Sequence, residues 1–170
     1  MVTILACQDK RSLKLFERIP EILHGDDPFF VPPFPGSIVR LFHPDSPACK
    51  HGELYPLIAW RDDKPVGRIA AYVNHAHNRY YSDKVGFFGF FDTVDDIEVA
   101  EVLLDKAREI LMAKGCDTIR GPYSPTVNDE CGLLVEGFDS SPFVMMPYNP
   151  QYYPGLYEQL GLKPVRDLYA

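Results

Sequence analysis

The chain has 170 residues, a size typical of one domain, and its 46% apolar and 24% charged residues are ordinary for a globular protein. The net charge of −7 argues against a nucleic-acid partner and against anionic membrane surfaces, because both select basic faces. The apolar runs are too short for a membrane span and the first residues lack the pattern of a secretory signal, so we expect a cytoplasmic protein.

The first quarter of the chain alternates short regular elements with a proline-rich loop. Residues 2–7 read as a strand, and residues 10–25 carry apolar side chains at helical spacing. Pro20 should bend or break that helix, because proline lacks an N–H and clashes with the preceding turn. The stretch DPFFVPPFPGS cannot be a central strand, so we predict a loop folded over the body, followed by a short helix over 37–42.

The middle of the chain predicts a hairpin and a buried strand. Residues 55–62 and 65–74 read as two strands joined by the turn signal RDDKP. Residues 85–93, VGFFGFFDT, follow as a further strand. Simple alternation places Phe88 and Phe90 on one face and the other phenylalanines on the opposite face, as a central strand requires.

Two histidines and four cysteines raise the question of a metal site. His75 and His77 could supply two ligands, but no further ligand follows at a recognised spacing, and the cysteines form no C-x-x-C pair. We therefore predict a surface connection over 75–84, no metal ion and no disulfide framework.

The clearest predicted element is a helix that follows the aromatic strand and ends before Gly115. Thr93 with Asp96 three residues later resembles a capping box, and Gly115 has the place of a C′ glycine. One face of this helix is an apolar stripe made of Ala100, Leu103, Leu104, Ala107, Ile110 and Leu111.

The last third predicts less regular structure. Residues 116–123 read as a fifth strand, and residues 124–150 show no clean periodicity. A short helix over 151–161 and a last strand over 163–170 complete an α/β domain that spans residues 1–170.

This element order, ending in NPQYYPGLYEQLGLKPV, resembles the GCN5-related N-acetyltransferase superfamily. The matching helix of that superfamily reads A-x-x-L-Y-E-K-x-G-F, with an asparagine upstream, and the hairpin RDDKPVGRIAAYV resembles its second and third strands. More closely, GFFGFF, NDECGLLVEGFD and MMPYNPQYY resemble a group of bacterial acetyltransferase-like proteins, whose longer members continue beyond this chain. The positions that match the helix motif are Asn149, Leu156, Tyr157, Glu158, Gly161 and Leu162.

The resemblance implies a mixed central sheet flanked by helices, with two central strands splayed apart at their C-terminal ends. It also implies acyl transfer from acetyl-coenzyme A or another acyl-coenzyme A to a small-molecule amine. Phe91, Thr93 and Asn149 would then contact the coenzyme.

One segment departs from the superfamily pattern. The pyrophosphate loop of the superfamily reads Q/R-x-x-G-x-G/A, whereas this chain has TVDDIEVA, with Asp95, Asp96 and Glu98 and no glycine or base. A carboxylate about 5 Å from a phosphate charge costs about 3 kcal/mol at an effective dielectric constant of about 20. We therefore expect weak or absent coenzyme A binding to this chain alone.

The densest group of chemically active side chains is the segment NDEC. Asp129 or Glu130 could take a proton from an attacking amine, and Asn128 could contact the substrate. The alternative is that Asn128 and Asp129 only bond their own backbone to hold a turn.

Tyrosines complete the candidate site. Tyr157 would protonate the leaving thiolate, as the resemblance implies, although a tyrosine at an apolar helical position also serves packing. Tyr123 and Tyr148 are expected to line the substrate pocket, because both loops that carry them reach the C-terminal ends of the strands.

Two functions remain open from the sequence. One is an acyl-coenzyme A-dependent N-acyltransferase. The other is a catalytically silent domain of the same fold that binds a ligand or dimerises. We expect either a homodimer or a further C-terminal domain as its partner.

Overall fold

A long hairpin forms the middle of the sheet in the computed structural model, which describes residues 1–169. Strand β2 (Gly52–Arg61) turns into β3 (Lys64–Asn74) through Asp62 and Asp63. Their φ angles of 48° and 61° suit a two-residue hairpin turn, which requires positive φ at both positions. The hairpin predicted from RDDKP is confirmed.

The hairpin is extended on both sides into a five-stranded mixed sheet. Strand β1 (Thr3–Ala6) pairs with β2, and β4 (Val85–Thr93) pairs with β3, both antiparallel. Strand β5 (Thr118–Arg120) pairs in parallel with β4, giving the order β1-β2-β3-β4-β5. The regular pairing of β4 with β5 ends at Phe87, and beyond it β6 (Tyr123–Ser124) lies against β4, with the N–H of Phe90 donating to Ser124 Oγ. The predicted mixed α/β sheet is confirmed.

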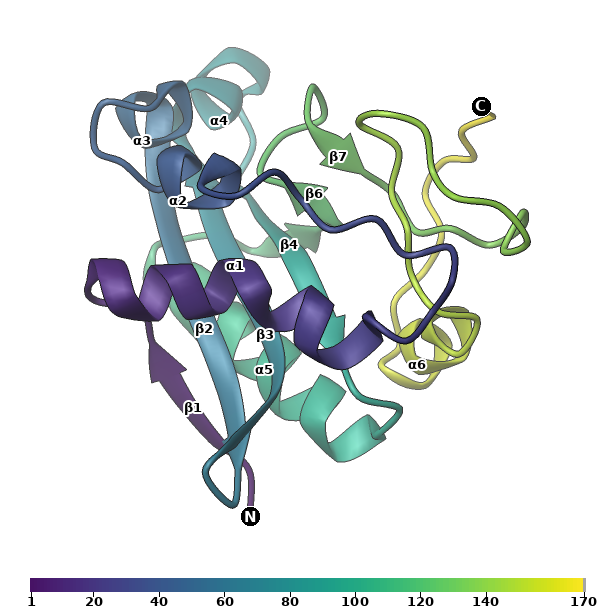
Figure 1. The fold of residues 1–170 in the computed structure, drawn as a ribbon. Coiled ribbons are helices and arrows are strands. Elements are labelled where there is room, and N and C mark those ends of the chain that lie inside the picture. The colour runs from purple at the N-terminus through teal and green to yellow at the C-terminus, as the bar shows by residue number, and fades with distance from the viewer. Residues whose placement is uncertain (170) are drawn as a thin grey trace.

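Helices cover both faces of this sheet, and a small hairpin lies at its end (Figure 1). The remaining elements are α1 (Lys10–His24), α2 (Ser37–Leu41), α3 (Pro47–His51), α4 (His75–Tyr81), α5 (Ile97–Ala113), β6 (Tyr123–Ser124), β7 (Glu130–Cys131) and α6 (Tyr153–Gln159).

Each face of the sheet has its own hydrophobic core. On one face, α5 and α6 pack against the sheet through residues such as Leu103 and Leu156. On the other face, α1 and α2 pack through Phe16, Ile19 and Ile38. Figure 1 shows α1 crossing the front of the sheet and α5 lying behind it.

Strand β4 does not alternate simply between these two cores. Phe90 has a φ of 49°, and the register with β3 shifts between Arg68 and Ala70. This bulge sends Phe90 to the α1 face, whereas Phe88 and Phe91 face α5. The expectation that Phe88 and Phe90 share a face is therefore wrong, although aromatic side chains do fill both faces.

The structure also bears on three further expectations. Residues 163–169 are exposed and irregular, so the predicted last strand is absent from the part of it that the structure describes, and residue 170 lies outside the described chain. The predicted surface connection after β3 forms helix α4, which Asn74 caps. Pro20 lies inside α1 without ending it.

Candidate functional site

The C-terminal end of β4 opens onto a cavity of about 380 Å³. It is enclosed by the C-terminal half of α1, the loop that follows α1, the end of β4, the β6–β7 hairpin, the loop after β7 and helix α6. Figure 1 shows the loop between α1 and α2 running across the front of the molecule toward the yellow-green C-terminal loops. The side chains that bring charge or a phenol group to its lining are Arg68, Asp92, Asp129, Glu130, Tyr148, Tyr153 and Tyr157.

A buried ion pair lies at the wall of the cavity. Arg68 Nε donates to Asp92 Oδ2 at 2.7 Å, and both side chains are largely buried, with 6% and 15% exposed. The guanidinium also lies 4.9 Å from the ring centroid of Phe16, a cation–π distance. The pair therefore fixes one carboxylate and one cation beside the cavity before any ligand arrives.

The position of Arg68 follows from the proline in α1. Pro20 has no N–H, so the carbonyl of Phe16 lacks the donor that an α-helix normally supplies four residues later. Arg68 Nη1 donates to that carbonyl at 2.7 Å. The helix consequently continues through Pro20 because a strand residue satisfies the open carbonyl.

A second buried chain of contacts lies beside the ion pair. His24 Nε2 is 3.1 Å from the hydroxyl of Tyr153 and 3.7 Å from Asp92 Oδ1. Burial lowers the pKa of His24, and Arg68 adds to this while Asp92 opposes it. The hydroxyl of Tyr153 also accepts from the backbone N–H of Thr93 at 2.8 Å. These contacts join α1, the end of β4 and α6 behind the cavity.

The two carboxylates of NDEC have different surroundings. Asp129 Oδ2 accepts from the hydroxyl of Thr126 at 2.6 Å and from its N–H at 3.2 Å, which is a local turn. Glu130 is an exposed residue that lines the cavity, and its carboxylate makes no hydrogen bond or ion pair with residues 1–169. Desolvation by the surrounding residues raises the pKa of Glu130, while Arg68 opposes the rise and Asp92 adds to it.

Tyr157 reaches the cavity from α6. Its ring packs edge-on against Phe91, with 5.4 Å between the ring centroids. Its hydroxyl makes no hydrogen bond to the described part of the chain. Burial raises the pKa of Tyr157 well above its usual range, so the phenol keeps its proton at neutral pH.

The other candidate residues divide between the cavity and the scaffold. Phe91 lines the cavity, and so does Tyr148, whose hydroxyl donates to Asp27 at 2.5 Å. Asn149 also lines it, but its amide binds the backbone of Leu134, accepting at 2.7 Å and donating at 3.1 Å. Thr93 lies behind the cavity wall rather than in it.

Asn128 and Tyr123 are not among the lining residues. Asn128 is exposed in the turn held by Asp129. Tyr123 stacks on Phe87 with 5.4 Å between ring centroids. The structure thus brings Asp129, Glu130, Tyr148, Asn149, Phe91 and Tyr157 to one cavity and leaves Asn128, Tyr123 and Thr93 outside it.

Sequence reasoning missed the ion pair and His24. Arg68 was a visible signal, because a base interrupts the otherwise apolar strand VGRIAAYV. Asp92 was another, as a carboxylate at the C-terminal end of an aromatic strand.

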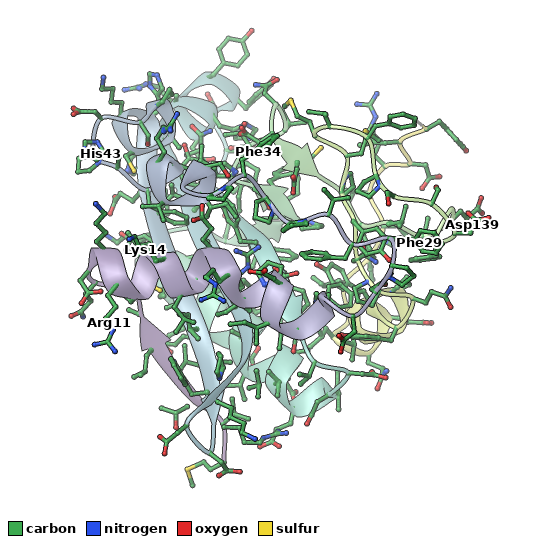
Figure 2. All side chains as sticks on the ribbon, in the orientation of Figure 1. Arg11, Lys14, Phe29, Phe34, His43 and Asp139 are labelled. Atoms are coloured by element: carbon green, nitrogen blue, oxygen red, sulfur yellow. The ribbon has the colours of Figure 1, made fainter. Side chains whose placement is uncertain are left out.

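The charge around the cavity is strongly one-sided. Residues 121–162 contain no lysine, arginine or histidine but five carboxylates, of which Asp129 and Glu130 line the cavity. Figure 2 shows the bases Arg11 and Lys14 on the first half of α1, across the molecule from Asp139. This distribution favours a cationic ligand over an anionic one.

The junction between β4 and α5 is closed by the protein itself. Asp96 is the N-cap of α5 and accepts from the N–H of Glu98 at 2.9 Å, so the predicted capping box with Thr93 is wrong. Arg61 donates to Asp96 at 2.7 Å and to Glu98 at 3.0 Å. The helix N-terminus therefore already holds carboxylates, and the residues present do not fit the pyrophosphate of coenzyme A.

A membrane-spanning helix and a metal-binding group are both absent from the described residues. None of the helices in the described chain has the length and apolar character needed to cross a membrane. Within residues 1–169 no three His, Cys, Asp or Glu side chains are grouped so that they could hold a metal ion.

Comparison with curated proteins gives two relatives, although no family model matches the chain. The chain is 37% identical over 164 residues to protein YghO of Escherichia coli K12, and 31% identical over 171 residues to a bacterial ceramide synthase of Caulobacter vibrioides. The matches cover 95% and 99% of this chain but only 42% and 44% of those proteins. The chain therefore spans less than half the length of these relatives.

Comparison with solved structures concerns the fold. An aminoglycoside acetyltransferase from an uncultured soil metagenomic sample, in complex with trehalose, has a TM-score of 0.56 at 15% identity over 99% of this chain and 95% of that one. AAC(6')-Iy, in complex with the bisubstrate analogue CoA-S-monomethyl-acetylneamine, has a TM-score of 0.56 at 14% identity over 100% and 96%. With its mixed sheet, the bulged fourth strand and the helices on both faces, the chain has the fold of the GCN5-related N-acetyltransferases.

Proposed function

We propose that this chain supports N-acyl transfer, in which the acyl group of a thioester passes to an amine bound in the cavity. The observation that carries the proposal is the environment of Glu130. Its carboxylate is unpaired, faces a cavity and has a raised pKa, and the same cavity contains the protonated phenol of Tyr157. A carboxylate and a phenol of this kind suit proton removal and proton delivery.

Glu130 is the proposed base, in preference to Asp129. A raised pKa brings a carboxyl group closer to neutral pH, where proton exchange with an amine is most efficient. Asp129 is bound to Thr126 and holds the turn. It adds negative charge but is not free to move a proton.

The Arg68–Asp92 pair is proposed to orient the acceptor. The carboxylate of Asp92 is 15% exposed and lines the cavity, so an ammonium or hydroxyl group of a ligand can approach it. The guanidinium keeps it from rotating, since Arg68 is itself held by the carbonyl of Phe16. Asp92 would therefore position the acceptor while Glu130 accepts its proton.

Tyr157 is the proposed proton donor. As the new N–C bond forms and the C–S bond breaks, the thiolate leaves and takes the phenolic proton of Tyr157. The proton that Glu130 removed from the amine then restores the phenol, directly or through water.

The acceptor is proposed to be an amine with a long apolar chain. A ceramide is the amide of a fatty acid and a long-chain amino alcohol, and one relative is named a bacterial ceramide synthase. The cavity suits such a molecule, because apolar side chains line most of it and Val31 and Met145 are partly exposed at its rim. Asp92 and Glu130 would receive the amine.

The test is amide formation by this chain. The protein is incubated with a long-chain acyl thioester and a long-chain amino alcohol, and the amide is measured by mass spectrometry. We expect product, with Glu130→Gln lowering its rate by about a hundredfold and Asp139→Asn, on an exposed loop, leaving it unchanged. Failure to form amide from any amine offered would contradict the proposal.

A second candidate is a catalytically silent ligand-binding domain. It is favoured by one specific observation, the closed and acidic β4–α5 junction. Such a domain would bind the long-chain amine, as seen by calorimetry, without forming amide from any thioester.

A further inference from the structure

The free edge of β4 beyond Phe87 is covered by groups of the protein itself. The N–H of Phe90 donates to Ser124 Oγ at 2.9 Å, and the backbone of Tyr123 lies so close to Gly89 that a Cβ there would be 1.6 Å from its carbonyl oxygen. Further along, Thr93 donates to Tyr153 at 2.8 Å. The chain after β5 and helix α6 thus occupy the strand edge that leads from the cavity to α5.

The carbonyl of Thr93 is occupied as well. The hydroxyl of Tyr152 donates to it at 2.6 Å, while Tyr153 binds the N–H of the same residue. Tyr153 is 1% exposed, so its ring cannot swing aside without opening the core. The amide groups of a pantetheine arm therefore cannot hydrogen-bond to the N–H or the C=O of Thr93.

The helix end beyond Thr93 is unsuitable for phosphate. Asp95, Asp96 and Glu98 bring three carboxylates to the first turn of α5 and its approach, and the neighbouring Arg61 is paired with two of them. The four groups together carry three negative charges and one positive charge. Anion binding at a helix N-terminus needs free N–H groups and a favourable electrostatic field. Here Asp96 already accepts from the N–H of Glu98, and the carboxylates make the field unfavourable for an anion.

From these contacts we infer that the protein recognises its acyl donor by the acyl-thioester end and not by the nucleotide end. This inference rests on the proposed function for its donor, and it specifies the donor class as acyl thioesters that are bound without contacts to a nucleotide. The cavity supplies the contacts for the acyl group, and the β4–α5 junction contributes no binding energy from the nucleotide phosphates.

The first experiment compares two donors with the same acyl group. One is the acyl-coenzyme A, and the other is the acyl-pantetheine thioester, which lacks the nucleotide. We expect kcat/KM values that agree within about threefold, because no contact to the nucleotide is available to be lost. An advantage of about thirtyfold or more for the acyl-coenzyme A would overturn the inference while leaving the proposed acyl transfer intact.

The second experiment does not require turnover. Calorimetry measures the binding of coenzyme A, of pantetheine and of adenosine 3′,5′-bisphosphate to the unmodified chain. We expect coenzyme A to bind no more tightly than pantetheine, and the bisphosphate not to bind at about 1 mM. Binding of the bisphosphate at about 10 μM would overturn the inference, whatever the activity of the protein.

A charge variant adds the matched control. Asp95→Asn with Glu98→Gln removes two carboxylates and keeps Asp96 as the cap, so affinity for coenzyme A should rise while affinity for pantetheine stays the same. Asp105→Asn makes the same kind of charge change further along α5 and should alter neither. An equal effect of both variants on coenzyme A would contradict a local role for the junction.

Discussion

Residues 52–113 and residues 121–159 are built by different means. The first segment contains β2, β3, α4, β4 and α5, and apart from the bulge at Phe90 its apolar side chains follow the period of the element they belong to. The second contains only β6, β7 and α6 as regular elements, and side chains bonded to backbone groups hold much of the remainder. The comparison teaches that the packed layers provide rigidity, whereas single polar contacts shape the cavity.

The buried ion pair within the first region is expected to show the largest effect. Arg68→Met leaves Asp92 as a buried, unpaired charge and the carbonyl of Phe16 without a donor, so the free energy of unfolding should fall by about 4 kcal/mol. Guanidinium denaturation followed by circular dichroism measures it. Adding Asp92→Leu should restore most of the loss, and equal stability of the single and double variants would contradict a charge origin.

A substitution in the layered region should affect the whole molecule. Leu103 is fully buried under the sheet, and Leu103→Ala should lower the free energy of unfolding by about 3 kcal/mol. All probes should unfold together at a lower denaturant concentration. Met112→Ala is the control on the same helix, since Met112 is 71% exposed, and its effect should stay within about 0.5 kcal/mol.

A substitution in the irregular region should act locally instead. Asn149→Ala leaves the N–H and C=O of Leu134 without partners, at a cost of about 2 kcal/mol. Hydrogen exchange should accelerate around Leu134 and remain slow in α5. Asn128→Ala, in an exposed turn, should change neither, and acceleration in α5 would show that the two regions are not separable.

The smallest effect is expected from acidification. The folded-state pKa of His24 lies below its ordinary value of 6.5, because burial disfavours the charged ring among Asp92, Asp27, Arg68 and Tyr153. The unfolded chain therefore binds the proton more readily, so stability is complete above the unfolded pKa and is lost as the pH falls through the folded pKa.

Denaturation midpoints measured at pH of about 7 and about 5.5 test whether stability falls on acidification. Unmodified protein should be less stable at the lower pH, and His24→Gln should reduce the difference. A wild-type protein that becomes more stable on acidification in this window would show that the sign is wrong.

The sequence predicted the layered region well because its pattern is local. The apolar stripe of α5, the glycine after it and the turn between β2 and β3 each depend on neighbours within a few residues. The bulge at Phe90 escaped prediction, because its positive φ comes from contacts with β3 and β6 and not from its own neighbours.

The cavity was predicted in outline and missed in its charged part. The polar loops were expected at the strand ends because chain connectivity alone brings them there. The pairing of Arg68 with Asp92 and the approach of His24 to Tyr153 depend on how α1 crosses the sheet, which no local pattern encodes. The same limit explains the last strand, since residues 163–169 have strand-like composition but no partner edge in the described structure.

Positions 20 and 68 depend on each other, although they are distant in the sequence. A residue with an N–H at position 20 would complete the helix bond to Phe16 and compete with Arg68 for the same carbonyl. A chain that lost Arg68 would, conversely, keep a proline with nothing to satisfy the turn it interrupts. Positions 20 and 68 should therefore vary together among homologous proteins, as a single unit of change, although one lies on a helix and the other on a strand.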